Sequence, residues 1–256
     1  MTGISKKVLS ALALLAVWIL VWQTAFELFG RGSYTFKPPL EVLGALWEEA
    51  RDGDLFRDLL ASLGRVALCY SLAVLLGALL GFFSLANRWV EWLIGPLILG
   101  IQSLPSICWV PMAIITFGLG ESAILFVVLI GSVGSITAAT RDGLRQVPAA
   151  YHRVAATFGA SARQRLCWVS IPAALPVFVS GLKQGWSFAW RSLMAGEVML
   201  KVAGLGHTLT ISREVADYPR MFAVMLVLVC VSVLVDRAIF SRLEQHVRAR
   251  WGLAGR

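Results

Sequence analysis

Two ionisable side chains lie within a long apolar stretch of the sequence, and their types suggest either ion pairing or solute binding. Arg191 and Glu197 both fall between residues 171 and 200, where only Lys183 is also charged. If this stretch spans a membrane, an arginine at its centre costs about 2.5–3.5 kcal/mol on insertion scales, so it should face protein or water. The two residues lie about 120° apart on a helix and are poor partners for each other.

Each of these charges therefore needs a partner on another helix, in a second copy of the chain or in a solute. Two interpretations remain open: both residues are members of structural ion pairs, or they serve a translocation pathway in which Arg191 attracts an anion. We assign a candidate pathway or gate to five residues: Gln102, Pro105, Trp190, Arg191 and Glu197. For Trp190, packing inside a helix is the competing explanation.

A second candidate site is the polar segment between residues 141 and 170. Pro148 suits the first position of a helix, and Gly159 suits the left-handed residue just past a helix end. Ser161 followed by Gln164 forms a capping box that begins a second helix, and Pro172 restricts how that helix continues. This pattern predicts a helix, a tight turn and another helix outside the membrane, a shape typical of a docking element.

The sequence lacks the residue patterns that catalysis or metal binding would need. The histidines His152, His207 and His246 fall in predicted loops or in the tail, and the four cysteines have no metal-ligand spacing. The sequence contains no G-x-S-x-G, H-E-x-x-H or phosphate-binding G-x-x-x-x-G-K-[ST] motif. We expect no catalytic residue, no metal site and no bound cofactor in this chain.

The composition of the chain predicts membrane-spanning helices as the elements that position these candidate site residues. The chain is 58% hydrophobic and 15% charged, whereas soluble domains carry about 25% charged residues. Spanning a bilayer takes roughly 20 apolar residues in a helix. The apolar runs predict an all-α, polytopic membrane protein: a single domain, 1–256, with about six transmembrane helices at 8–28, 60–86, 92–118, 122–140, 171–200 and 219–240.

The distribution of charge predicts the orientation. The loop at 141–170 contains five arginines and one aspartate, whereas the segment 29–59 contains six acidic residues. Because lysine and arginine favour the cytoplasmic side, we expect both termini and the arginine-rich loop inside a bacterial inner membrane. The first helix could instead be a signal peptide, but no Ala-x-Ala-like site closes it. The net charge of +8 shows no basic patch interleaved with aromatic residues, which argues against nucleic acid.

Three details refine this topology. Val42, Leu46 and Trp47 recur at helical spacing among acids, which predicts an amphipathic helix at about 40–52 on the outer surface. Pro96, Pro105 and Pro111 predict that the third spanning helix is kinked or broken. Gly77 and Gly81 form a small-x-x-x-small pair that permits close helix packing.

The segment 147–176 also resembles the cytoplasmic signature of permease subunits of binding-protein-dependent ABC importers. That signature reads E-A-A, three residues, Gly, nine residues, then I-x-L-P. Gly159 takes the glycine position and Val169–Pro172 takes the last four, whereas Arg153 and Val154 replace the first two residues and Ala155 keeps the third. The spacing is retained, but the missing glutamate removes any ion pair that this residue would make with an ATPase.

The resemblance extends from Pro38 to Trp251 and is closest to the nitrate, sulfonate and taurine branch. Further stretches that carry it are 62–65, 104–121, 181–182, 188–197 and 204–206. It implies a MetI-like ABC importer permease fold and an ATPase-coupling loop containing Ala149, Tyr151, His152, Arg153, Ala155, Ala156, Gly159, Ala160 and Ser161.

The same resemblance implies the partners and the solute. We expect a second permease copy, which would make a homodimer, two ATP-hydrolysing subunits that bind ATP and Mg²⁺, and an extracytoplasmic solute-binding protein. The solute would be a small oxyanion or sulfonate such as nitrate, a sulfonate or taurine, although related permeases also carry uncharged heterocycles. The competing functions are a channel or secondary transporter without an ATPase, an intramembrane enzyme, and a membrane scaffold.

Overall fold

The computed structural model describes residues 2–86 and 88–251, and this part of the chain forms helices and their connections without a β-strand. The predicted all-α class is confirmed. Met1, Asn87 and residues 252–256 of the predicted domain lie outside the described residues. The α-helices are α1 (Thr2–Ala25), α2 (Pro39–Asp52), α3 (Asp54–Ala86), α4 (Arg88–Ser103), α5 (Val110–Phe117), α6 (Glu121–Arg145), α7 (Ala149–Thr157), α8 (Ala162–Arg165), α9 (Ile171–Leu200), α10 (Leu205–Glu214), α11 (Tyr218–Val235) and α12 (Ser241–Arg250).

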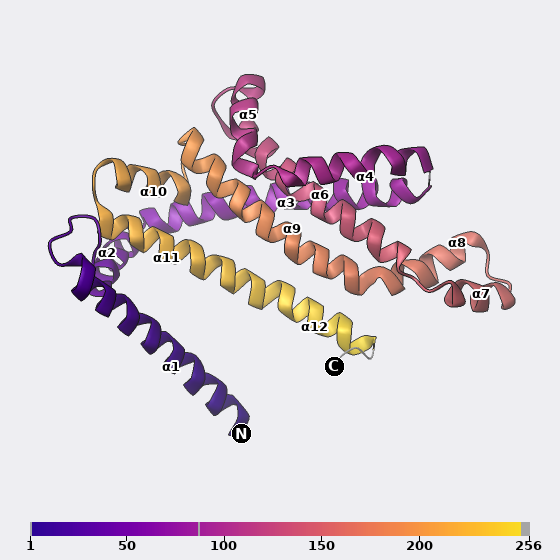
Figure 1. Cartoon of the computed structure of the whole chain (residues 1–256), viewed down its shortest axis with the longest axis horizontal. Coiled ribbons are helices and arrows are strands. Elements are labelled where there is room, and N and C mark those ends of the chain that lie inside the picture. The colour runs from indigo at the N-terminus through magenta and orange to yellow at the C-terminus, as the bar shows by residue number, and fades with distance from the viewer. Residues whose placement is uncertain (1, 87, 252–256) are drawn as a thin grey trace.

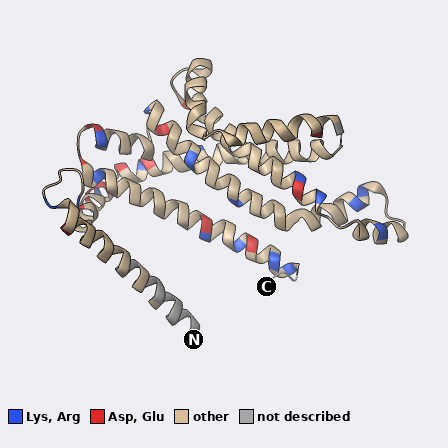
Figure 2. Ribbon diagram, in the orientation of Figure 1, with Lys and Arg blue, Asp and Glu red and all other residues tan. Residues whose placement is uncertain are grey.

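The long helices α3, α9 and α11 run along the longest axis of the molecule, with α2 and α10 at one end and α7 and α8 at the other (Figure 1). Charged residues gather mostly toward these two ends (Figure 2). The acidic segment 29–59 and the arginine-rich segment 141–170 therefore lie at opposite ends. We name them the outer and the inner end, after the orientation expected from the sequence.

Four helical segments among the described residues are long and apolar enough to cross a membrane: Asp54–Leu85, Glu121–Arg145, Ala162–Leu200 and Tyr218–Arg250. The pair α4 and α5 makes a fifth if it counts as one span. The first predicted helix corresponds to α1, where the apolar stretch Ala16–Gly30 is shorter than these four. The first of the six predicted spans therefore remains a prediction.

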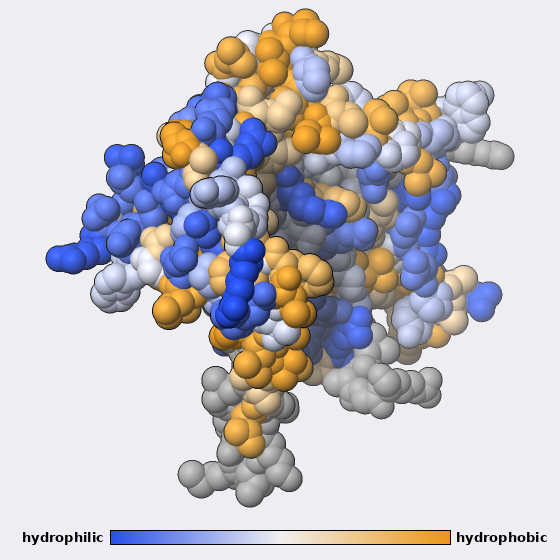
Figure 3. Space-filling model, turned by 60° about the vertical axis from the view of Figure 1, so that its left-hand side comes forward, coloured by the Kyte–Doolittle hydropathy of each residue, from blue (hydrophilic) through white to orange (hydrophobic). Residues whose placement is uncertain are grey.

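The third predicted helix, 92–118, is broken, as its three prolines predicted. α4 ends at Ser103 and a 3₁₀ turn, Ser106–Trp109, leads into α5, with a bend of 101° between the two arms. Pro105 begins the turn with an extended backbone, which a proline ring permits and a helix interior does not. We call residues 103–109 the elbow. From it, α5 projects sideways, and apolar residues cover this projection in the space-filling view (Figures 1 and 3).

Small residues allow α3, α6 and α9 to pack closely, as predicted for Gly77 and Gly81. A Cβ atom at Gly77 would lie 2.8 Å from Cβ of Ile136, and one at Gly81 would lie 2.6 Å from Cβ of Thr140. Gly181 and Gly185 on α9 approach α6 in the same way. The contact between α6 and α9 is the most extensive in the described part of the chain.

Several boundaries differ from the predicted ones. α3 begins at Asp54 rather than at 60, because Gly53 at φ 80° ends α2 immediately before it. α6 continues to Arg145 rather than ending at 140, since Arg145 forms an ion pair with Glu91 and needs no lipid contact. α7 begins at Ala149, with Pro148 one position earlier as the N-cap.

The predicted loop 141–170 is shorter than expected, because α8 continues into α9 through the π-helical turn Leu166–Ser170. The backbone N–H of Ile171 donates to Leu166 O in this turn, which accommodates Pro172 at the start of α9. Only residues 146–161 lie between the long helical segments. α2 occupies 39–52 and packs against α11, with Val42 buried and Trp47 exposed.

Candidate functional site

The turn after α7 has the predicted geometry. Gly159 has φ +77°, and its N–H donates to Ala156 O at 3.0 Å. The N–H of Ala160 donates to Ala155 O at 3.1 Å, which completes a Schellman motif. Ser161 and Gln164 form the predicted capping box at the start of α8. The residues that carry the family-like spacing are therefore those that set the direction of the chain between α7 and α8.

α7 presents apolar side chains away from the rest of the protein. It contains no buried residue, and Tyr151, Val154 and Phe158 are 52%, 56% and 86% exposed. These three residues lie at i, i+3 and i+7, so they share one face of the helix. α7 is outside the candidate spans, so a position within a membrane-crossing helix does not account for this exposure. An apolar face at a polar end of the molecule is typical of a binding surface for another protein.

Glu197 lies at the outer end in a buried polar network that ties α3, α9 and α10 together. Its carboxylate is fully buried and accepts hydrogen bonds from Ser62 Oγ at 2.8 and 2.9 Å, from the N–H of Gly206 at 2.9 Å and from the guanidinium of Arg65. Ser62 Oγ also accepts from the N–H of Leu205 at 3.0 Å.

Arg65 extends this network to α6. Its Nε and Nη2 atoms donate to the two carboxylate oxygens of Glu121 at 2.6 and 2.7 Å, and Nη2 also donates to Ala203 O at 3.1 Å. Such a bidentate ion pair requires the planar guanidinium group of an arginine. Arg65 is 8% exposed at its side chain and Glu121 is 60% exposed, so the network runs from the protein interior to the surface.

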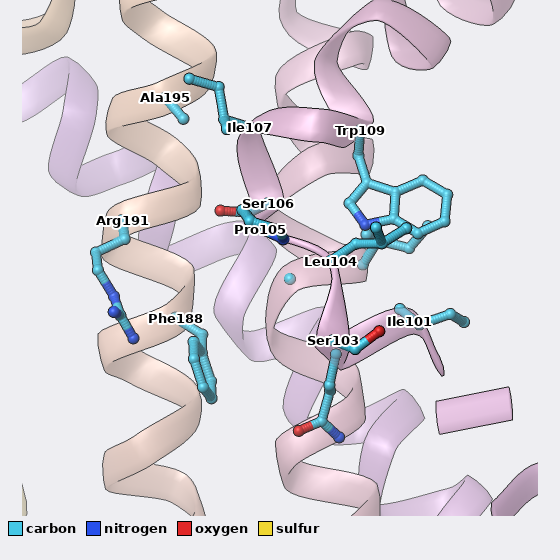
Figure 4. Close-up of a pocket in the computed structure, with 13 residues that line it drawn as sticks. Ile101, Ser103, Leu104, Pro105, Ser106, Ile107, Trp109, Phe188, Arg191 and Ala195 are labelled. Carbon is cyan, nitrogen blue, oxygen red and sulfur yellow. The ribbon is translucent and has the colours of Figure 1, made fainter. Parts of the chain in front are cut away.

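Arg191 lines a cavity of about 450 Å³ between α9, α6 and the elbow. In Figure 4, Phe188 and Arg191 project from α9 on one side, and Leu104, Pro105 and Ser106 face them from the elbow. Gln102, Ser103 and Trp109 also line the cavity, and Ile130 and Gly131 contribute from α6. This cavity lies where the chain turns away from the spanning direction.

The structure brings together three of the five residues assigned to a pathway. Gln102, Pro105 and Arg191 line the cavity, whereas Glu197 lies in the outer network and Trp190 lies in the packed core. Trp190 stacks on Trp186 with ring centroids 6.2 Å apart and an interplanar angle of 18°. Glu197 does not pair with Arg191, as expected from their angular separation.

Sequence reasoning missed Ser62, Arg65 and Glu121 as partners of Glu197, and Trp109 and Phe188 as neighbours of Arg191. A signal was present, because all five fall within the stretches 62–65, 104–121 and 188–197 that carry the family resemblance. Among the described residues, no group of three or more His, Cys, Asp or Glu is placed to hold a metal ion.

Comparison with known proteins gives consistent results. Residues 73–248 match the model of the family described as "binding-protein-dependent transport system inner membrane component". The chain is 28% identical to the taurine transport system permease protein of Escherichia coli, covering 94% of this chain and 90% of that protein. A bicarbonate transport system permease protein of Synechococcus elongatus is 29% identical, with 73% and 68% covered. A putative ABC transporter permease of Methanocaldococcus jannaschii is 31% identical, with 73% and 70% covered.

Solved structures agree on the fold. A chain of the MetNI methionine ABC transporter in an inward-facing conformation superimposes with a TM-score of 0.65, covering 78% of this chain and 98% of that one at 19% identity. A chain of an amino acid ABC transporter crystallised with histidines superimposes with a TM-score of 0.64 at 17% identity. At these identities the likeness concerns the fold alone.

Proposed function

The chain belongs to the family of binding-protein-dependent transport system inner membrane components, and from this membership we propose that it couples solute import to a separate ATPase through α7 and the turn at Gly159. The relatives are ABC transporter permeases, and the described helices suit a membrane subunit. In this proposal the chain hydrolyses no ATP itself, and ATP and Mg²⁺ bind to the partner subunit.

The exposed apolar face of α7 is the observation that carries this proposal. Tyr151, Val154 and Phe158 form a face that nothing within the described chain covers, on a helix whose direction is fixed by a Schellman motif and a capping box. A channel or secondary transporter acting alone would have no use for such a face. A partner that binds α7 could displace α9 directly, because α8, the π-helical turn and α9 form one helical segment.

The complete transporter would contain two copies of the permease, two ATPase subunits and an extracytoplasmic binding protein that docks at the outer end. Two identical copies are the simpler arrangement, and a related second permease is the alternative. Named relatives transport taurine, bicarbonate and, in Bacillus subtilis, putatively aliphatic sulfonates. We therefore propose a small oxyanion or sulfonate as the solute, with the cavity at Gln102, Pro105 and Arg191 on its pathway.

The coupling proposal is tested by Gly159→Val. A valine at φ +77° is strained, and the space around Gly159 is open, so the strain acts on the turn rather than on packing. We expect normal insertion but weakened ATPase binding and at least tenfold lower solute-stimulated ATP hydrolysis in the reconstituted complex. Gly53→Val is a matched control, because Gly53 also has positive φ and open surroundings but lies at the outer end. Normal stimulated turnover with Gly159→Val would remove the coupling proposal.

The orientation is tested by single cysteines at Asp52 and Arg163 in a chain without its native cysteines. We propose that both termini and α7 face the cytoplasm of a bacterial cell and that α2 faces outward. An impermeant thiol reagent added outside intact cells should then label the cysteine at 52 and not the one at 163. Labelling of both from outside would contradict this topology.

A further inference from the structure

Among the described residues that line the cavity at the elbow, Arg191 is the one that is ionisable. Its Nε donates to Ser187 O of its own helix at 3.1 Å, and its guanidinium carbon lies 4.9 Å from the centroid of the Phe188 ring. No carboxylate among the described residues forms an ion pair with it. A guanidinium has five N–H donors, so its four Nη donors remain available toward the cavity.

Gln102 is a second polar residue that lines the cavity, and its amide carries N–H donors. Its Nε2 atom lies close to α6, since a Cβ atom at Gly134 would be 2.7 Å from it. Trp109 also lines the cavity, but its indole nitrogen is buried and has no hydrogen-bond partner among the described residues. The Trp109 ring therefore contributes a wall of the cavity and no accessible donor.

The wall of the cavity behind Arg191, where α6 meets α9, is tightly packed. A Cβ atom at Gly131 would overlap the Oγ of Ser192, which is fully buried and has no hydrogen-bond partner in the described structure. α6 therefore lies directly against α9 behind Arg191. Arg191, Gln102 and Trp109 all line this cavity, and Figure 4 shows Arg191 and Trp109 on opposite sides of it.

We propose that this cavity is an anion-binding site of the permease itself, in which Arg191 is the residue that selects for the negatively charged group of the solute. The inference rests on the proposed function and deepens it by assigning a selective step to this chain in addition to the binding protein. The site recognises the shared chemistry of sulfonates, carboxylates and bicarbonate, namely a compact group of acceptor oxygens. The apolar lining from Ile101, Leu104 and Ile130 accommodates a short uncharged body.

A first experiment measures the electrostatics of the site without knowledge of the solute. Ser103, an exposed lining residue, is replaced by cysteine in a complex whose permease lacks its native cysteines. Its reaction rate is compared for two thiosulfonate reagents, one carrying a sulfonate and one carrying a trimethylammonium group. We expect the anionic reagent to be favoured roughly tenfold over the ratio seen with a free thiol in solution. Arg191→Gln should abolish this preference and Arg191→Lys should retain it.

Arg213→Gln is the matched control, because Arg213 is an exposed arginine on α10 outside the cavity. It should leave the preference unchanged. A preference that persists in an assembled Arg191→Gln complex would overturn the proposal, as would the absence of any preference in the parent protein.

A second experiment measures transport by the reconstituted complex with its ATPase and binding protein, using taurine, methanesulfonate, bicarbonate and nitrate as probes. For the probe that the parent complex transports, Arg191→Gln should lower uptake at least tenfold while the complex assembles, and Arg191→Lys should retain part of it. Full uptake by an assembled Arg191→Gln complex would overturn the proposal that Arg191 binds the anion. If the parent complex transports no probe with ATP, the proposed function fails, whereas loss of the reagent preference in Arg191→Gln would still support an anion site.

Discussion

Glu197 and Arg191 lie on the same helix and both carry a charge in an apolar stretch, yet they meet different surroundings. Glu197 is fully buried and accepts hydrogen bonds from three other residues at the outer end. Arg191 lines a cavity, and within the described part of the chain its hydrogen bond is to Ser187 O of its own helix. Because the protein supplies the counter-charge of Glu197 and none among the described residues for Arg191, we assign a structural role to Glu197 and propose ligand binding for Arg191.

The largest effect that would test this contrast is expected from Glu197→Ala. Removing the carboxylate leaves the buried guanidinium of Arg65 with Glu121 as its one carboxylate partner among the described residues, and it removes the acceptor that Ser62 Oγ and the N–H of Gly206 use. Breaking a buried ion pair on one side costs about 3–5 kcal/mol. We expect a large loss of folded yield and a lower midpoint of thermal unfolding in detergent.

The control for this variant is Glu214→Ala, which removes an exposed carboxylate paired with Lys201 at 2.8 Å. It should leave yield and midpoint unchanged. If Glu197→Ala were as stable as the parent protein, the network would contribute no stability and Glu197 would become a candidate for the pathway again.

A smaller effect is expected from Gly206→Ala, which tests how closely α10 is held against Glu197. The added Cβ atom would lie 2.6 Å from Cβ of Glu197, so α10 must shift away from α9. Overpacking of this kind costs about 1–3 kcal/mol, and thermal unfolding should show it. Gly100→Ala has no neighbouring atom within 4 Å and is the control for the added methyl group. Equal midpoints for the two variants would mean that α10 is not tightly docked.

The smallest effect on stability is expected from Arg191→Gln. Because no carboxylate in the described chain pairs with Arg191, its removal should change the free energy of unfolding by less than about 0.5 kcal/mol. Thermal unfolding of the purified permease measures this directly. A loss as large as that of Glu197→Ala would show that Arg191 has a structural counter-charge, and the contrast between the two residues would disappear.

Local chemistry made the turn at the inner end predictable. Gly159, Ser161 and Gln164 act within a few residues of each other, so the positive φ and the capping box follow from the types and spacing alone. The broken third helix was predictable for the same reason, since Pro105 acts on the backbone immediately around it.

The family resemblance marked the stretches that contain the partners of Glu197, but the pairing itself was not predictable, because it depends on contacts between distant parts of the chain. Ser62 and Arg65 lie more than 130 positions before Glu197, and no local pattern connects them. The prediction from apolar runs also ended each helix at the first charged residue, which placed the end of α6 too early. α6 passes Arg141 and Asp142 because a helix can continue beyond the hydrocarbon region once water solvates its side chains.

Helix α9, Ile171–Leu200, has a mechanical consequence. At 1.5 Å per residue it is about 45 Å long. The network around Glu197 holds it near its outer end, about 39 Å from Ile171 and about 9 Å from Arg191. It is therefore a lever with unequal arms: a tilt of about 5° around Glu197 moves Ile171 by about 3–4 Å and Arg191 by less than about 1 Å. Motion at the inner end of α9 is reduced roughly fourfold at the cavity, and force is multiplied by the same ratio.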